Sequence, residues 1–142
     1  MRISDKALAY GLLRIALGVN FAGHGFTRIY NGIGQFAATT AEHMVKAPLP
    51  HGFVLGFSYG IPVIEAVLGV ALMLGLATRV ALVCGALFMM ALTIGVTSNQ
   101  QWDVAGQQLV YSIVFFVLLF LVEWNGLSLD ARIGRNRAAS FS

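Results

Sequence analysis

Two ionisable residues near the end of the first apolar stretch, His24 and Arg28, are spaced one helical turn apart. On an α-helix this spacing places both side chains on one face. An imidazole titrates near neutral pH and can transfer protons. A guanidinium stays charged and can donate hydrogen bonds to a carbonyl or to an anion. The spacing therefore predicts a polar pocket that handles protons, although Arg28 can instead simply extend to the lipid head groups.

Arg14 lies on the same helical face, within an arc of roughly 80° that also contains Phe21, His24 and Arg28. Glu65 is the only acid well inside any apolar stretch. If the two helices pack antiparallel, Glu65 is nearest to the level of residue 19. Arg14 can then reach the Glu65 carboxylate directly, and His24 can reach it through water. Either contact can serve chemistry, or it can only hold the two helices together.

Smaller features of the sequence extend this expected pocket. Gly18 and Gly25 lie beside the polar face and leave room for another backbone or for a flat ligand. A polar stripe near the start of the last apolar stretch contains Gln108, Tyr111 and Ser112. The other two histidines, His43 and His51, fall between apolar stretches and are expected to be solvated.

The composition indicates an integral membrane protein. Of the 142 residues, 58% are hydrophobic and 11% are charged, whereas soluble domains carry about 25% charged residues. The net charge of +3 comes from residues near the segment ends, so it indicates membrane topology and no nucleic-acid binding. A single cysteine, Cys84, and a single histidine within an apolar stretch exclude iron–sulfur and bis-histidine haem ligation by this chain alone. No metal site is expected.

Four apolar segments are long enough to cross a bilayer as helices, at about residues 7–30, 53–76, 78–98 and 104–124. We therefore predict an all-α bundle of four transmembrane helices in a single domain, residues 1–142. Helical spacing between the first two segments predicts a short interfacial helix that ends at the Pro-Leu-Pro of residues 48–50. Basic residues predict that both termini are cytoplasmic, namely Arg2, Lys6, Arg79, Arg132, Arg135 and Arg137.

Two stretches, LLRIALGVNFAGHGFTRIY and IPVIEAVLGVALMLGLATRVAL, resemble the DoxX/DoxD-like family of small four-helix membrane proteins. The resemblance covers about residues 10–125. It is carried by Arg14, the His24–Gly25 pair with Arg28, Glu65 with Gly69, and the Gly-Leu-Ala-Thr-Arg turn that ends at Arg79. Family members often have Lys where this chain has Arg28. The best-known members are similar to the membrane subunit of a thiosulfate:quinone oxidoreductase.

The resemblance implies a quinone-linked redox setting in a bacterial or archaeal cytoplasmic membrane, with sulfur or oxidative-stress metabolism as its context. We expect a membrane subunit of such a complex, with protein partners or further copies of itself in the bilayer. Its quinone pocket would use His24 and Glu65 for proton transfer and would be completed by Arg14, Arg28 and Tyr111. Two alternatives stay open: a non-catalytic anchor or assembly subunit of a larger oxidoreductase, and a small transporter or channel subunit.

Overall fold

The protein is described by a computed structural model that covers residues 3–139, with side chains up to Gly134. Within these residues every regular element is helical, so the predicted all-α class is confirmed. The long helices are α1 (Asp5–Tyr30), α3 (His51–Leu74), α4 (Thr78–Ser98) and α5 (Trp102–Phe120). The shorter elements are α2 (Ile33–His43), the 3-10 turn η1 (Val122–Trp124) and α6 (Leu129–Ala139). The helix expected between the first two apolar segments is thus present as α2, but it ends at His43, before the Pro-Leu-Pro of residues 48–50.

Local chemistry sets the ends of these helices. Ser4 accepts a hydrogen bond from the Ala7 amide at 3.3 Å and caps the start of α1. Pro50 precedes the first turn of α3, and Gly75 ends α3 in the left-handed conformation, with φ of +65°. A left-handed residue at this point reverses the chain, so that α4 begins only three residues after Gly75.

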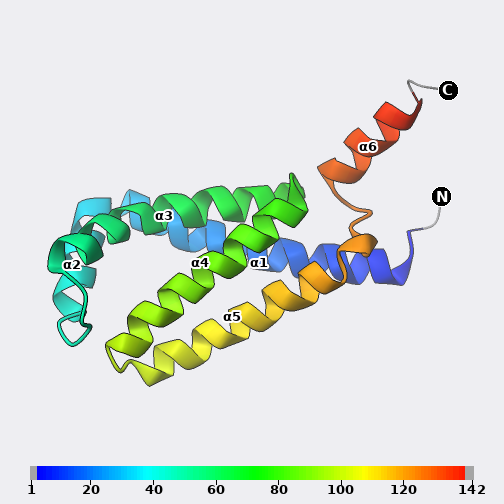
Figure 1. Ribbon diagram of the computed structural model, residues 1–142. Coiled ribbons are helices and arrows are strands. Elements are labelled where there is room, and N and C mark those ends of the chain that lie inside the picture. The colour runs from blue at the N-terminus through cyan, green and yellow to red at the C-terminus, as the bar shows by residue number, and fades with distance from the viewer. Residues whose placement is uncertain (1–2, 140–142) are drawn as a thin grey trace.

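The long helices form two layers (Figure 1). One layer is the pair α1 and α3, the other is the pair α4 and α5, and α2 crosses one end. We call this end the α2 end and the opposite end, where the two termini lie, the α6 end. The layers are joined by a core in which the Phe21 ring meets the edges of Phe115 and Tyr111 at centroid distances of 5.4 and 6.1 Å.

Glycines bring the backbones of α1 and α3 into direct contact. A Cβ added to Gly25 would lie 2.6 Å from the Pro62 carbonyl oxygen, and one added to Gly69 would lie 2.7 Å from the Ala22 Cα. Both distances are shorter than van der Waals contact. The space beside Gly25 is therefore filled by the α3 backbone and not by a flat ligand. These contacts also fix the register of the two helices, with Gly69 opposite Ala22.

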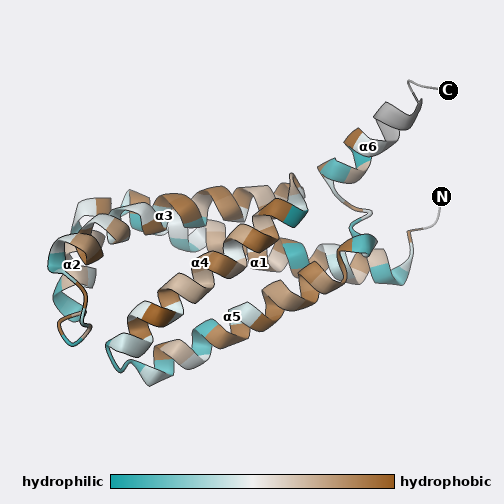
Figure 2. Ribbon diagram, in the orientation of Figure 1, coloured by the Kyte–Doolittle hydropathy of each residue, from teal (hydrophilic) through white to brown (hydrophobic). Residues whose placement is uncertain are grey.

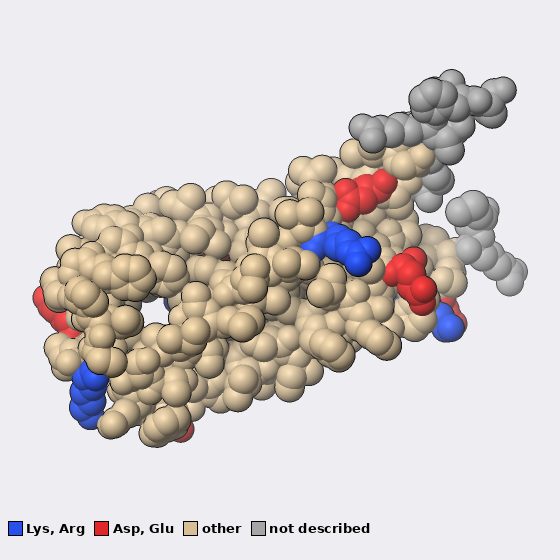
Figure 3. Space-filling model, in the orientation of Figure 1, with Lys and Arg blue, Asp and Glu red and all other residues tan. Residues whose placement is uncertain are grey.

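The surface between the two ends is apolar. Helices α3, α4 and α5 are long and apolar enough to cross a membrane; α1 does not meet the same criterion. Apolar residues dominate these three helices in Figure 2, and in the view of Figure 3 the charged side chains gather towards the two ends of the molecule. Large exposed side chains in the apolar zone include Val67, Leu87, Ile113 and Phe116. The sides of the bundle are therefore suited to lipid.

Asp130, at the start of α6, caps the start of α4. Its carboxylate accepts hydrogen bonds of 2.7 Å from the amides of Ala77 and Thr78, and Ala77 itself has no capping side chain. Burial acts to raise the pKa of the Asp130 carboxyl. The hydrogen bonds from Thr78 and Ala77 and the positive charge of Arg14 outweigh that effect, so the pKa lies below its usual value.

Candidate functional site

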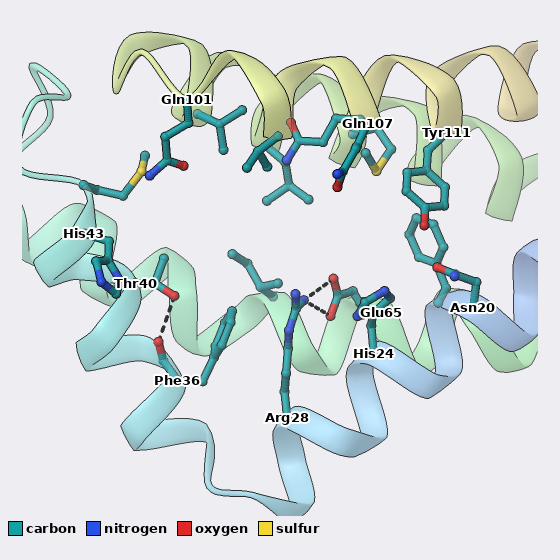
Figure 4. Close-up of a pocket in the computed structure, with 18 residues that line it drawn as sticks. Asn20, His24, Arg28, Phe36, Thr40, His43, Glu65, Gln101, Gln107 and Tyr111 are labelled. Carbon is teal, nitrogen blue, oxygen red and sulfur yellow. Dashed lines mark hydrogen bonds and ion pairs between the residues drawn. The ribbon is translucent and has the colours of Figure 1, made fainter.

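A cavity with a volume of about 430 Å³ lies at the α2 end, between the two helix layers. An opening into the molecule is visible near this end in Figure 3. All five α-helices from α1 to α5 contribute to its wall (Figure 4). Its size is within the usual range for small-ligand pockets. Four of the predicted site residues line it: His24, Arg28, Glu65 and Tyr111.

An ion pair between α1 and α3 forms one side of the cavity. The Arg28 guanidinium donates hydrogen bonds to both carboxylate oxygens of Glu65. It also lies against the ring of Phe36 on α2, with 4.6 Å between its Cζ atom and the ring centroid. The Arg28 side chain is 30% exposed and that of Glu65 is 9% exposed. A ligand in the cavity would therefore meet the cation more readily than the carboxylate.

His24 lies one turn before Arg28 on α1, and its ring is next to Glu65 in Figure 4. It is exposed and lines the cavity. One turn earlier still, Asn20 points towards the hydroxyl of Tyr111, which reaches across from α5. Beside the ion pair, the cavity is therefore lined by the imidazole of His24, the phenol of Tyr111 and the carboxamide of Asn20.

The remaining polar residues are amides on α5 and two residues of α2. Gln101, just before α5, and Gln107, on α5, reach into the cavity opposite Thr40 and His43 of α2 (Figure 4). Gln108 also lines it, and its buried side-chain oxygen has no hydrogen-bond partner among the described residues. A free buried acceptor is costly unless a donor is supplied. The site therefore suits a ligand that offers both carbonyl and hydroxyl groups.

Arg14 does not contact Glu65, contrary to the sequence-based expectation. It lies near the α6 end, is 1% exposed, and donates hydrogen bonds to the carbonyls of Leu72, Met73 and Leu127. The Met73 and Leu127 bonds are 3.2 and 2.6 Å long. Two of these acceptors belong to the last turn of α3, where the carbonyls carry partial negative charge. Arg14 therefore joins α1 to the end of α3 and to the segment that follows α5.

Several cavity residues were not predicted as part of the site. His43 was expected to be solvated, yet it lines the cavity, because α2 folds back against α3. Asn20 precedes His24 by four residues, and Gln107 precedes Tyr111 by four, so helical spacing alone was enough to include them. Gln101 and Thr40 gave no such signal, since Gln101 precedes α5 and Thr40 lies on α2, where no residue was predicted to be part of the site.

The DoxX family model matches residues 9–98, a range that contains Arg14, His24, Arg28 and Glu65 but not the α5 side of the cavity. No curated protein and no solved structure matches the chain.

Proposed function

The chain belongs to the DoxX family of membrane proteins, and we propose that it is the quinone-binding membrane subunit of a redox complex. One observation carries the proposal: a polar cavity with an ion pair, an imidazole and a phenol lies inside a bundle whose outer surface is apolar. Ionisable groups at such a depth are costly and commonly mark functional sites.

We propose that α1 is a fourth membrane span. Its 26 residues correspond to about 39 Å of helix, which exceeds a hydrocarbon core of about 30 Å. Its polar residues Arg14 and Arg28 have partners inside the bundle. Its opposite face carries Leu12, Val19 and Phe26, each at least 51% exposed. The average hydropathy of α1 is therefore lowered by residues that lipid does not contact.

The proposed orientation puts the α2 end, and hence the cavity mouth, on the outer side of a prokaryotic cytoplasmic membrane. Lys6, Arg79 and Arg132 support it, because they lie towards the α6 end. Arg2 and the side chains of Arg135 and Arg137 are outside the described part of the chain.

In a Cys84→Ser background, an impermeant thiol reagent should label Val45→Cys on intact cells and should not label Ala77→Cys. The reverse pattern would overturn the orientation.

The cavity residues fit the needs of a quinone, which accepts two electrons and two protons when it is reduced. Arg28 and the Tyr111 hydroxyl can donate hydrogen bonds to carbonyl oxygens on opposite sides of the cavity. The carboxamides of Gln101 and Gln107 can accept a hydrogen bond from a hydroxyl. The imidazole of His24 can act as a proton donor and acceptor, and Glu65 lies next to it to receive or return that proton. We assign the delivery of electrons to a partner subunit.

The test of this function is the His24→Gln variant, which keeps the size and hydrogen bonding of the side chain but cannot titrate near pH 7. His51→Gln is the matched control, because His51 is exposed and does not line the cavity. The complex should be purified gently from its native membrane, and its quinone content, partner association and quinone-dependent turnover should be measured. We expect His24→Gln to assemble normally and to lose turnover.

Normal turnover in His24→Gln would reject the proton-transfer role. If the native complex also contained no quinone, the anchor or assembly function would become the better conclusion. Solute flux should also be measured after the same preparation is reconstituted into liposomes. Flux through the protein would favour the transporter or channel function.

A further inference from the structure

A second cavity lies beside the first and is almost wholly apolar. Its volume is about 320 Å³, and its wall is built from α2, α3 and α4. The apolar side chains include the stacked rings of Phe53 and Phe57, whose centroids are 6.2 Å apart. The Thr40 hydroxyl donates to the Phe36 carbonyl at 2.8 Å and is thereby satisfied within its own helix. The second cavity therefore offers little to a polar ligand.

The two cavities share one wall. Five residues line both of them: Thr40, Met44, Ile61, Leu92 and Val96. On one side of this wall lie the ion pair and His24, and on the other lie only apolar surfaces and the small side chain of Ser58. A single ligand that occupied both spaces would need a polar ring at one end and an apolar chain at the other.

The second cavity also reaches the outer surface of the bundle. Phe53 on α3 and Ile94 on α4 belong to its wall, and they are 60% and 63% exposed. Both lie on membrane-length apolar helices, so this rim faces lipid in the proposed arrangement. A chain that entered the second cavity from the bilayer would therefore meet apolar side chains at this rim.

We propose that the apolar cavity holds the prenyl chain of an amphipathic ligand whose polar ring occupies the cavity at Arg28, His24 and Glu65. This inference rests on the proposed function for the identity of the ring, but the chain site is defined by its own wall. A chain gains little hydrophobic free energy by leaving lipid for such a wall. The cavity therefore acts mainly by orienting the ligand, so that its ring enters at the level of the ion pair.

The test uses a prenyl alcohol that carries a photoreactive diazirine and has no quinone ring, incorporated into liposomes with the protein. We expect labelling to concentrate on the cavity-lining parts of α3 and α4, within residues 53–61 and 91–96. Ala91→Phe should reduce this labelling at least about fivefold, because a close-packed site has no other room for the chain once a ring fills it. Met90→Phe is the control, since Met90 is adjacent, 57% exposed and not part of the wall.

A second filling variant guards against misfolding of Ala91→Phe. In Gly95→Leu, the added Cβ would meet only the terminal methyl of Met44, at 3.3 Å. Binding of a quinone without a prenyl chain is measured on the same variants. Neither filling variant should change it by more than about twofold, because Ala91 and Gly95 line the second cavity and not the cavity of the ion pair.

The outcomes separate the two proposals. Equal labelling of wild type, Ala91→Phe and Gly95→Leu would overturn the chain site, whether or not a quinone binds. Selective labelling that both filling variants abolish, with no quinone binding in wild type, would reject the quinone function and keep the chain site for another amphipathic ligand. Loss of chain-free quinone binding in the filling variants would show that the two cavities are not separate sites, which also overturns the inference.

Discussion

The guanidinium of Arg28, on α1, contacts both carboxylate oxygens of Glu65, on α3. The pair is formed by helices that are brought together at Gly25, three residues before Arg28, where the α3 backbone leaves no room for a side chain. The charge of Glu65 is therefore balanced from the cavity side, and removing either member of the pair leaves the other without its partner.

The Arg28–Glu65 pair should show strong coupling in a double-mutant cycle. Arg28→Gln leaves the Glu65 carboxylate without its cation in a nearly buried position, whereas the double variant Arg28→Gln/Glu65→Gln contains no charge there. We expect a coupling energy of about 1–3 kcal/mol in the free energy of unfolding, measured by reversible denaturation in detergent. Simple addition of the two single effects would show that the pair is not coupled.

Arg14 is expected to be the more important arginine for stability. Arg14→Ala removes hydrogen bonds to three main-chain carbonyls and leaves a cavity in the core, so it should lower the free energy of unfolding by about 3 kcal/mol or more. Arg79→Ala is the control, because Arg79 is exposed. Both variants should be compared with wild type by thermal unfolding in detergent. If Arg14→Ala were as stable as wild type, the stabilising role of Arg14 would be contradicted.

Glycines on α1 and α3 differ sharply in the space around them. Gly25→Ala and Gly69→Ala each force a Cβ against the backbone of the partner helix, so we expect losses of about 2 kcal/mol or more. Gly23 has no atom within 4 Å of an added Cβ. Gly23→Ala should therefore be neutral or stabilising by up to about 1 kcal/mol, through helix propensity alone. Equal stabilities for Gly23→Ala and Gly25→Ala would refute the close packing of α1 on α3.

Asp130 makes stability depend on pH below neutrality. Its pKa is lower in the folded protein than its usual value, so the stabilisation is fully present above the unfolded-state pKa, about 3.9. The stabilisation decreases as the pH falls through the folded-state pKa. Asp130→Asn should reduce the free energy of unfolding near pH 7 by about 0.5–1 kcal/mol. Thermal unfolding from pH 7 to pH 3 should then show a smaller loss in this variant than in wild type; parallel curves would reject the cap.

Local patterns in the sequence were sufficient for most of the fold. The third apolar segment matches α4 at residues 78–98, because a left-handed Gly75 and the turn after Ser98 bound it sharply. The last segment ends earlier than predicted, since residues 122–124 form a 3-10 turn instead of continuing α5. Helical spacing also placed His24 and Arg28 on one face, and both do line the cavity.

The register between helices was not available from such patterns. We expected Glu65 at the level of residue 19, but Gly69 lies opposite Ala22, which puts Glu65 near residue 26. This shift of about two helical turns exchanges Arg14 for Arg28 as the partner of the carboxylate. The register is set where glycines, which lack a Cβ, let the two backbones come into contact. These contacts depend on both helices together, so the pattern of one helix does not predict them.

The hydrogen bonds of Arg14 have an evolutionary consequence. All three of its acceptors are main-chain carbonyls, belonging to Leu72, Met73 and Leu127, and every amino acid supplies such a carbonyl. Those three positions can therefore drift among relatives without weakening the contact, whereas a change of charge at position 28 or 65 has to be matched at the other position. Across homologous sequences, we expect Arg14 to be invariant and to have no covarying partner. Contact maps derived from coevolution would therefore miss the hydrogen bonds by which Arg14 joins the helices.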